Sequence, residues 1–473
     1  MPVFPSSWNQ QQLAVIYFSL FSGWLLSFLF EGPVFYALSA ERQIESAVLN
    51  QAAIFAHFAG LVTAGFYVTS LARARVVLIA VPALGLAGTM VLLMLPGQMW
   101  LPVMAMMAYF AGWAISAWGY LGRCFFNGLD RLWSLADILI YSNILLLVAH
   151  VLANNATALV GLVFILTGLA ANVALGRNLA DESPAASALV LIPTERLRWP
   201  LAVFAAFIFV ITLNSGIMYR VVYPAYEGFS GLISLYQVTP YIGAIWLVRR
   251  YANRMEYFHI LYIGLALLGL AYVLFSILDR SASSFFVVNT FMMAAWGVND
   301  LFWWTILGAA FHYVPNPAQL FGLGLGMNVL GVWCGSILGG ILLATGQGQL
   351  LAAALALIII FMAMFIIPVL NKKLGDLLGE HVFLQRMATV AVTAQENIFD
   401  KLKEEKQLTN REVEVVEQLL KGYTYKVISQ QLYISENTLK THVKNIYSKL
   451  NINSRVELFQ IADSRHRDRE LSG

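Results

Sequence analysis

The side chains best suited to chemistry in this sequence lie near its C-terminus, on one short segment. Apolar residues recur there at intervals of four, three and four, which predicts a helix with one buried face. These apolar residues are Leu439, Val443, Ile446 and Leu450. The outward-facing residues are Asn437, Lys440, Thr441, Lys444 and Asn445. Lysine binds phosphates or guanine acceptors, and asparagine and threonine hydrogen-bond to base edges, so this face suits the DNA major groove. A solvated lysine face on a packing helix is an equally good interpretation of the periodicity alone.

Capping signals divide residues 408–461 into four short helices that would position this face. Three of the helices begin at a hydroxyl residue, which can bond to the free backbone N–H groups of a first turn. The capping residues are Thr409 with Glu412, Ser435, and Ser454 with Glu457. Gly422 would end the first helix, because glycine adopts the left-handed cap without a Cβ penalty. A second helix is expected at residues 425–432.

Characteristic positions run through this segment in register and without a gap. They are Leu408, Thr409, Arg411, Glu412, Gly422, Lys426, Ile428, Leu432, Ile434, Ser435, Thr438, Lys440, His442, Ile446, Lys449, Leu450 and Arg455. The pattern resembles the LuxR-type helix-turn-helix domain. The resemblance implies that the third helix enters the major groove, where Lys440, Thr441 and Lys444 contact double-stranded DNA. Thr438 and His442 would support these contacts. It also implies that the fourth helix, at the C-terminal end, forms a homodimer on DNA.

The rest of the chain has a different composition. Overall, 59% of the residues are hydrophobic and 12% are charged, and the mean hydropathy is +0.70. A soluble domain has roughly 25% charged residues. Of the 55 charged side chains, 30 lie beyond residue 370, and no lysine precedes that position. The sequence therefore predicts a lipid-embedded membrane body with a soluble tail.

Apolar runs within the first 370 residues predict twelve transmembrane helices. A bilayer core about 30 Å thick needs about 20 apolar residues per helix. The runs are residues 13–35, 46–71, 76–95, 100–120, 132–152, 156–175, 201–222, 231–248, 258–278, 285–311, 320–343 and 350–370. The longest polar connection, residues 176–200, divides them six and six. The expected fold class is all-α, a polytopic bundle followed by a four-helix DNA-binding tail.

Arginine placement predicts the orientation of this bundle, because cytoplasmic loops carry the excess of basic residues. On one side the connections contain Arg73, Arg75, Arg123, Arg131, Arg177, Arg196, Arg198, Arg249, Arg250 and Arg254. The other side has Arg42, Arg220 and Arg280. We therefore expect both termini in the cytoplasm of a bacterium and the chain in its inner membrane. A DNA-binding tail requires the same orientation.

Twelve helices in two halves with a long central loop resemble the major facilitator superfamily. The loop between the second and third helices of that family usually has a Gly-x-x-x-Asp-Arg-x-Gly-Arg pattern. Residues 69–75 here, Thr-Ser-Leu-Ala-Arg-Ala-Arg, keep arginines and lose the glycines and the aspartate. The equivalent loop at residues 248–254 is similarly reduced. Because the motif governs conformational switching in transporters, its loss disfavours vigorous transport.

Polar residues within the apolar runs are candidates for a ligand pocket, because each is costly in a bilayer. In the facilitator family, the first, fourth, seventh and tenth helices line a central cavity. Candidates on these helices are Glu31, Trp113, Asn214, Arg220, Asn299, Asp300 and Trp303. Acids beside aromatic rings suit a cationic or polar aromatic ligand. Alternatively, the charged residues lie at the membrane interface, and the tryptophans belong to an aromatic belt.

These patterns predict a membrane sensor domain at residues 1–370, a linker at 371–407 and a DNA-binding domain at 408–473. No catalytic triad, metal-ligand spacing or phosphate loop is present in the sequence. Cys124 and Cys334 lie inside apolar runs. We therefore expect neither an enzyme nor a cofactor. The favoured function is a one-component transcription regulator that senses a small molecule. A transporter with a regulatory tail and a membrane domain that only anchors the tail are the alternatives.

Overall fold

A computed structural model describes residues 9–30, 32–126, 128–180, 194–229, 236–251, 257–389, 408–420, 428–429, 431–452 and 458. The chain divides into two compact units, Met1–Pro368 and Val369–Gly473. Every regular element in the described ranges is a helix, so the all-α fold class is confirmed.

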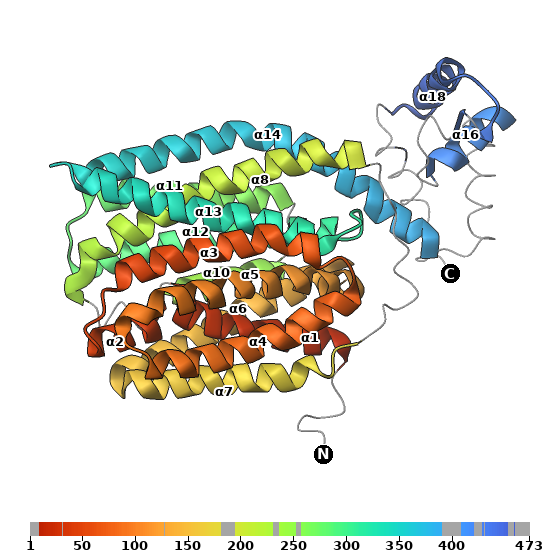
Figure 1. Cartoon of the computed structure of the whole chain (residues 1–473). Coiled ribbons are helices and arrows are strands. Elements are labelled where there is room, and N and C mark those ends of the chain that lie inside the picture. The colour runs from red at the N-terminus through yellow and green to blue at the C-terminus, as the bar shows by residue number, and fades with distance from the viewer. Residues whose placement is uncertain are drawn as a thin grey trace. The chain divides into compact units, whose positions relative to one another are not determined.

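The first unit is a bundle of long helices that run side by side (Figure 1). Its first half contains α1 (Gln10–Trp24), α2 (Pro33–Glu41), α3 (Ser46–Tyr67), α4 (Leu71–Met94), α5 (Trp100–Phe125), α6 (Gly128–Asn155) and α7 (Ala158–Gly176). Its second half contains α8 (Thr194–Ile217), α10 (Thr239–Tyr251), α11 (Tyr257–Ile277), α12 (Ala282–Ala310), α13 (Pro317–Leu343) and α14 (Gly348–Thr389). Short π-helical turns, Leu25–Leu29 and Met218–Val222, extend α1 and α8.

Eleven helical segments in the described part of this unit are long and apolar enough to cross a membrane. Eleven of the twelve predicted runs correspond to them. The remaining predicted run, residues 231–248, lies partly outside the described residues. Its second part falls in α10, whose 13 residues extend from Thr239 to Tyr251. Helix α14 continues to Thr389, so the predicted linker begins as helix.

The first predicted helix, residues 13–35, is interrupted. After α1 the chain passes through the π-helical turn and becomes extended at Phe30, and α2 begins at Pro33. Proline lacks the N–H that would continue the preceding hydrogen-bond ladder. A Cβ at Gly32 would lie 2.1 Å from the backbone of Ser27, so the sharp turn requires glycine. The expectation of one continuous helix was wrong at this point.

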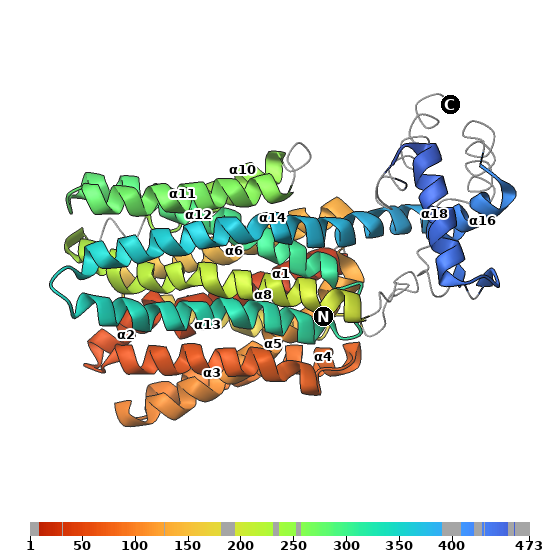
Figure 2. The same ribbon diagram turned by 90° about the horizontal axis from the view of Figure 1, so that it is seen from above.

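Helices α3, α13 and α8 lie side by side where the two halves of the bundle meet (Figure 2). Small residues allow this approach. A Cβ at Gly335 of α13 would lie 2.1 Å from the carbonyl oxygen of Leu213 in α8. The backbones of these two helices are therefore in direct contact.

The described part of the second unit has its own hydrophobic core. Helix α16 (Asn410–Leu420) and helix α18 (Glu436–Leu450) correspond to the first and third predicted helices of the tail. Their buried residues include Val415, Val416, Leu419, Leu420, Leu439, Val443, Ile446 and Leu450. Most of the second and fourth predicted helices, with Gly422 and the Ser454–Glu457 box, lies outside the described residues.

Both described capping predictions are confirmed. The Thr409 backbone N–H donates to Glu412 Oε2 at 2.8 Å, and the Glu412 N–H donates to Thr409 Oγ1 at 3.2 Å. The Ser435 hydroxyl accepts from the Thr438 N–H at 3.0 Å, which fixes the start of α18. These bonds satisfy donors that helix starts leave free.

Candidate functional site

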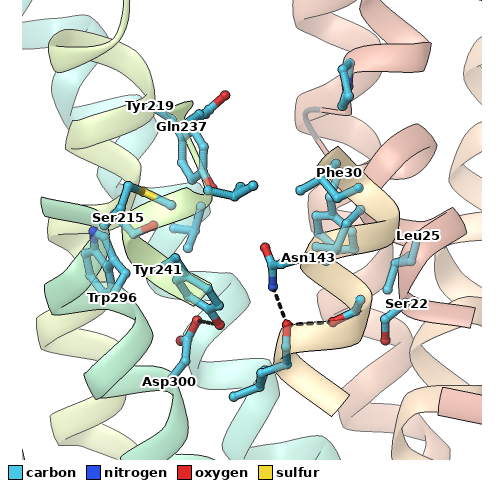
Figure 3. A pocket seen from close by; sticks show the side chains of 18 of the residues that line it. Ser22, Leu25, Phe30, Asn143, Ser215, Tyr219, Gln237, Tyr241, Trp296 and Asp300 are labelled. Atoms are coloured by element: carbon cyan, nitrogen blue, oxygen red, sulfur yellow. Dashed lines mark hydrogen bonds between the residues drawn. The ribbon is translucent and has the colours of Figure 1, made fainter. Parts of the chain in front are cut away.

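A cavity of about 700 Å³ lies between the two halves of the membrane unit. Ligand pockets typically have volumes of about 300–1,000 Å³. One wall comes from α8, α10 and α12, and the facing wall from α1 and α6 (Figure 3). Helices α2, α3, α5 and α13 and the segment that follows α8 contribute further lining residues.

An aspartate and a tyrosine form the polar centre of the second-half wall. Tyr241 of α10 donates its hydroxyl hydrogen to Asp300 Oδ2 of α12 at 2.8 Å (Figure 3). Trp296 and Trp304 line the cavity one helical turn before and after Asp300. The carboxylate is thus flanked by two indole rings.

The first-half wall contributes neutral polar groups. Asn143 of α6 donates its amide N–H to the Leu139 carbonyl at 2.8 Å, and its side chain lies between the walls (Figure 3). The Ser142 hydroxyl donates to the Ile138 carbonyl at 2.7 Å. His57 of α3 places Nδ1 3.0 Å from the Ala108 carbonyl oxygen. These groups add hydrogen-bonding capacity without a fixed positive charge.

The cavity opens at one membrane face, here called the far face, which holds the α2–α3 and α6–α7 connections. Its lining reaches Asn154 and Glu227, and both side chains are exposed there. The opposite face, here called the tail-side face, holds the α3–α4 and α5–α6 connections. Because successive long helices alternate in direction, α14 returns to the tail-side face.

An aromatic cluster, here called the aromatic plug, closes the cavity toward the tail-side face. Its rings are Phe18, Trp118 and Phe126 from the first half and Trp304, Phe311 and Phe321 from the second. Phe18 packs edge-on against Trp304, with ring centroids 5.4 Å apart. Edge-to-face pairs of this kind stabilise beyond the area they bury.

An ion pair also joins the halves. Arg249 Nε of α10 lies 3.0 Å from Asp137 Oδ1 of α6, and Arg249 Nη2 lies 3.1 Å from Asp137 Oδ2. A bidentate ion pair of this kind fixes the orientation of the two side chains and adds electrostatic stabilisation. The pair fixes the positions of α6 and α10 relative to each other.

Of the predicted pocket residues that the structure describes, Asp300 lines the cavity and the others do not. Asn214, Asn299 and Trp303 are buried between helices. Arg220 packs beside Gly339 and Gly340 of α13. Glu31 lies outside the described residues.

The fourth predicted membrane helix, α5, also lines the cavity with a residue other than the predicted one. Trp113 of α5 donates its indole N–H to Thr63 at 3.2 Å and stacks on Tyr67, so it packs against α3. From α5, Ile115 lines the cavity. Helices α6 and α10, on which no pocket residue was predicted, contribute Asn143 and Tyr241 instead.

Most of the predicted DNA-contact residues form one exposed face of α18. Asn437, Thr438, Lys440, Thr441, Lys444 and Asn445 are exposed, and His442 is half-buried. The Thr441 hydroxyl donates to the Asn437 carbonyl at 3.1 Å. Among the described residues, Lys440 and Lys444 form no ion pair with an acid, so α18 presents two uncompensated cations.

A buried acid holds α18 against α16. Lys449 Nζ lies 2.6 Å from Glu412 Oε2, and Glu412 is 4% exposed. Burial by itself raises the pKa of Glu412, but the Lys449 ammonium and the hydrogen bonds from Thr409 outweigh it. The pKa of Glu412 is therefore lowered from its usual value.

Comparison with known proteins identifies the tail. Residues 406–462 match the family of bacterial regulatory proteins described as the luxR family. The tail is a LuxR-type helix-turn-helix domain. The CsgBAC operon transcriptional regulatory protein of Escherichia coli K12 is 36% identical over 89 residues, which cover 19% of this chain and 41% of that protein. The transcriptional regulatory protein DegU of Brevibacillus brevis is 48% identical over 50 residues, 11% of this chain and 21% of that protein. The chain thus spans about two fifths or less of these relatives.

Solved structures identify the fold of the membrane unit. The human organic anion transporter MFSD10 (TETRAN) aligns with a TM-score of 0.58 at 12% identity, covering 76% of this chain and 98% of that one. The major facilitator superfamily transporter FucP, in its outward conformation, aligns with a TM-score of 0.52 at 15% identity, covering 76% and 99%. This is a multi-pass membrane protein with a major facilitator fold. At these identities the likeness concerns the fold alone.

Proposed function

We propose that this protein is a membrane-bound one-component transcription regulator. The membrane unit senses a small molecule in its cavity, and the LuxR-type tail binds promoter DNA in response. The observation that carries this proposal is the presence, in one chain, of a ligand-sized cavity and a helix face with two uncompensated lysines. The chain lies in the bacterial inner membrane, with both termini in the cytoplasm.

The tail binds double-stranded DNA through α18, as a homodimer formed by its C-terminal helix. Lys440 and Lys444 lie four residues apart and therefore on one helix face. Lysines placed this way bind phosphates or guanine acceptors, while the neighbouring Asn437 and Thr441 suit base edges. Glu412 and Lys449 support this function indirectly, because they fix α18 on α16.

Sensing requires two conformations of the bundle that bind the ligand with different affinity. The facing walls of the cavity belong to different halves, so movement of one half against the other changes the lining. The Asp137–Arg249 ion pair and the aromatic plug join the same halves. A ligand that prefers one arrangement thereby shifts the conformation that the tail experiences.

The test is footprinting of the full-length protein in lipid nanodiscs on fragments that cover the genome, including the DNA upstream of its own gene. We expect protection by the wild type, and loss of protection in the double variant Lys440→Ala/Lys444→Ala. Equal protection by this variant and the wild type would remove α18 from DNA recognition. Absence of a wild-type footprint across the genome would overturn the regulatory function.

Transport is the second candidate, and the major facilitator fold favours it. Uptake into proteoliposomes separates the two functions. Substrate accumulation at rates that match a transporter, with promoter output unchanged by the substrate, would favour transport. Binding without accumulation favours the sensor. A tail that binds DNA identically whatever the membrane unit binds would leave only an anchor.

A further inference from the structure

We infer that the ligand is an organic cation, a protonated amine on an aromatic body, which enters the cavity from the far face. This inference rests on the proposed function, because it names the class of molecule that the sensing cavity takes. It is carried by the two acids of that cavity, one of which has no cationic partner among the described residues, and by the aromatic walls.

Acidic side chains lie at two depths along the cavity. Glu227 lies at its opening, and Asp300 lies in its wall deeper in the bundle. Among the described lining residues, none is lysine or arginine. Acids at the mouth and in the interior raise the local concentration of cations, because apolar walls focus the field of the carboxylates. The same field opposes anions.

Two acids of the same bundle differ in their partners. Asp137 has a protein counter-ion, because Arg249 binds both of its carboxylate oxygens. Asp300 has a neutral partner, Tyr241, which donates to Oδ2. Within the described part of the chain, no cation pairs with Asp300. A carboxylate in a membrane interior is costly unless a charge compensates it. An ammonium ligand beside Asp300 would supply that charge.

The lining also offers contacts for the rest of the ligand. Trp296, Tyr219 and Tyr223 line the wall between Glu227 and Asp300. Aromatic faces attract ammonium groups and also pack against flat rings. The facing wall offers Asn143, whose amide can hydrogen-bond to a polar substituent at the other end of the ligand (Figure 3). An aromatic amine with a small polar group matches both walls.

The exposed end of the cavity determines the route of entry. At the far face the lining residues Asn154 and Glu227 are exposed. Toward the tail-side face, Phe18 and Trp118 of the aromatic plug are 2% and 0% exposed. The cavity is therefore accessible from the far face and closed on the other side. A ligand from the far side reaches Asp300 without crossing the plug.

The test uses three compounds of similar size: 2-phenylethylamine, which is cationic at neutral pH, neutral 2-phenylethanol and anionic 3-phenylpropionate. A panel of ring-hydroxylated phenylethylamines extends the cationic series. Binding to the full-length protein in detergent is measured by thermal shift and by the fluorescence of its tryptophans. We expect members of the cationic series to raise the melting temperature. The neutral and anionic compounds should leave it unchanged.

Two variants locate the site. Asp300→Asn keeps the volume and removes the charge, so it should weaken binding of the amine by about tenfold or more. Glu227→Gln, on an exposed side chain, should weaken it less. Glu45→Gln is the matched control, because Glu45 is an exposed acid that does not line the cavity, and it should bind like the wild type.

The binding results either support or overturn the assignment of an organic cation as the ligand. Selective binding of the amines that depends on Asp300 supports the inference. Equal or better binding of the alcohol or the carboxylate, or no shift with any amine of the panel, overturns it. If Asp300→Asn does not fold, the compound series and Glu227→Gln still decide. A promoter reporter separates this inference from the proposed function. Amine binding without a change in output contradicts sensing alone, whereas output that responds to other compounds contradicts the ligand class alone.

Discussion

Single lysines of α18 differ in what they touch. Lys449 pairs with the buried Glu412 and so belongs to the core contact between α18 and α16. Lys440 and Lys444 are exposed and have no acid partner among the described residues. Lys440 and Lys444 can therefore replace counterions on a phosphate backbone. Lys449 cannot do so without losing its contact with Glu412.

Replacing Lys440 or Lys444 by alanine should therefore weaken DNA binding and lower the salt slope by about one per phosphate contact. The measurement is a fluorescence-anisotropy titration of the full-length protein on promoter DNA at several salt concentrations. Lys449→Ala is the contrasting variant. It should lower the melting temperature of the tail, and the folded fraction should keep the wild-type salt slope. An unchanged slope in both Lys440→Ala and Lys444→Ala would show that neither lysine contacts phosphate.

Glu412 gives the tail a defined pH dependence. Its pKa is lower in the folded tail than in the unfolded chain, so its ionised form stabilises folding. This stabilisation is fully present above the ordinary pKa of a glutamate and is lost as the pH falls through the lowered value. Glu412→Gln should therefore flatten the acid limb of the stability curve measured by circular dichroism. A wild-type acid limb in this variant would assign the dependence to other acids.

Among the elements, helices could be predicted more easily than the faces they turn to one another. The tail lies in water, so polar and apolar residues separate on each helix, and the exposed face of α18 is visible in the sequence. In the membrane unit, the lipid-facing and the core-facing residues are both apolar. The sequence therefore indicated the helices that carry Asn214 and Trp303. It could not show that Ser215 and Trp304, one residue on, line the cavity instead.

The irregular elements of the membrane unit could not be predicted from the sequence either. A π-helical turn adds a residue to a turn without any compositional signal, and one follows α1 and another follows α8. The break before α2 had a signal in Gly32 and Pro33, but proline occurs inside α4 and α8 without interrupting them. Proline alone therefore did not distinguish a break from a continuing transmembrane helix.

The contact between α8 and α13 depends on the absence of a side chain at Gly335. Gly335→Ala would place Cβ 2.1 Å from the Leu213 carbonyl oxygen and force the helices apart. We expect a loss of stability of about 1–3 kcal/mol, as for other overpacked sites. Thermal unfolding in detergent measures it. Gly346→Ala is the matched control, because a Cβ there would meet nothing within 4 Å. Equal melting temperatures for the two variants would contradict close contact at Gly335.

At the scale of the whole molecule, the regulatory proposal requires the tail-side face to be cytoplasmic. A reporter that fluoresces only in the cytoplasm should be bright when fused after Ala185 or after Gln407. It should be dark after Gly346, which connects α13 to α14 at the far face. Immunoblots of the membrane fraction check that the fusions are equally abundant. Fluorescence after Gly346 would reverse the orientation and exclude DNA binding by the tail of the membrane-inserted protein.

The aromatic plug has an optical consequence. Trp118 and Trp304 come from different halves of the bundle, and each is packed against phenylalanine rings. Trp118 is fully buried, whereas Trp304 is half-buried and lines the cavity. Indole emission shifts to longer wavelength when water reaches the ring. If the halves separate at the tail-side face, water reaches Trp118 and its emission moves to longer wavelength. If they do not separate, its emission stays at short wavelength. Replacing the other tryptophans by phenylalanine would therefore leave a protein whose emission wavelength reports, without an attached label, whether that face is open.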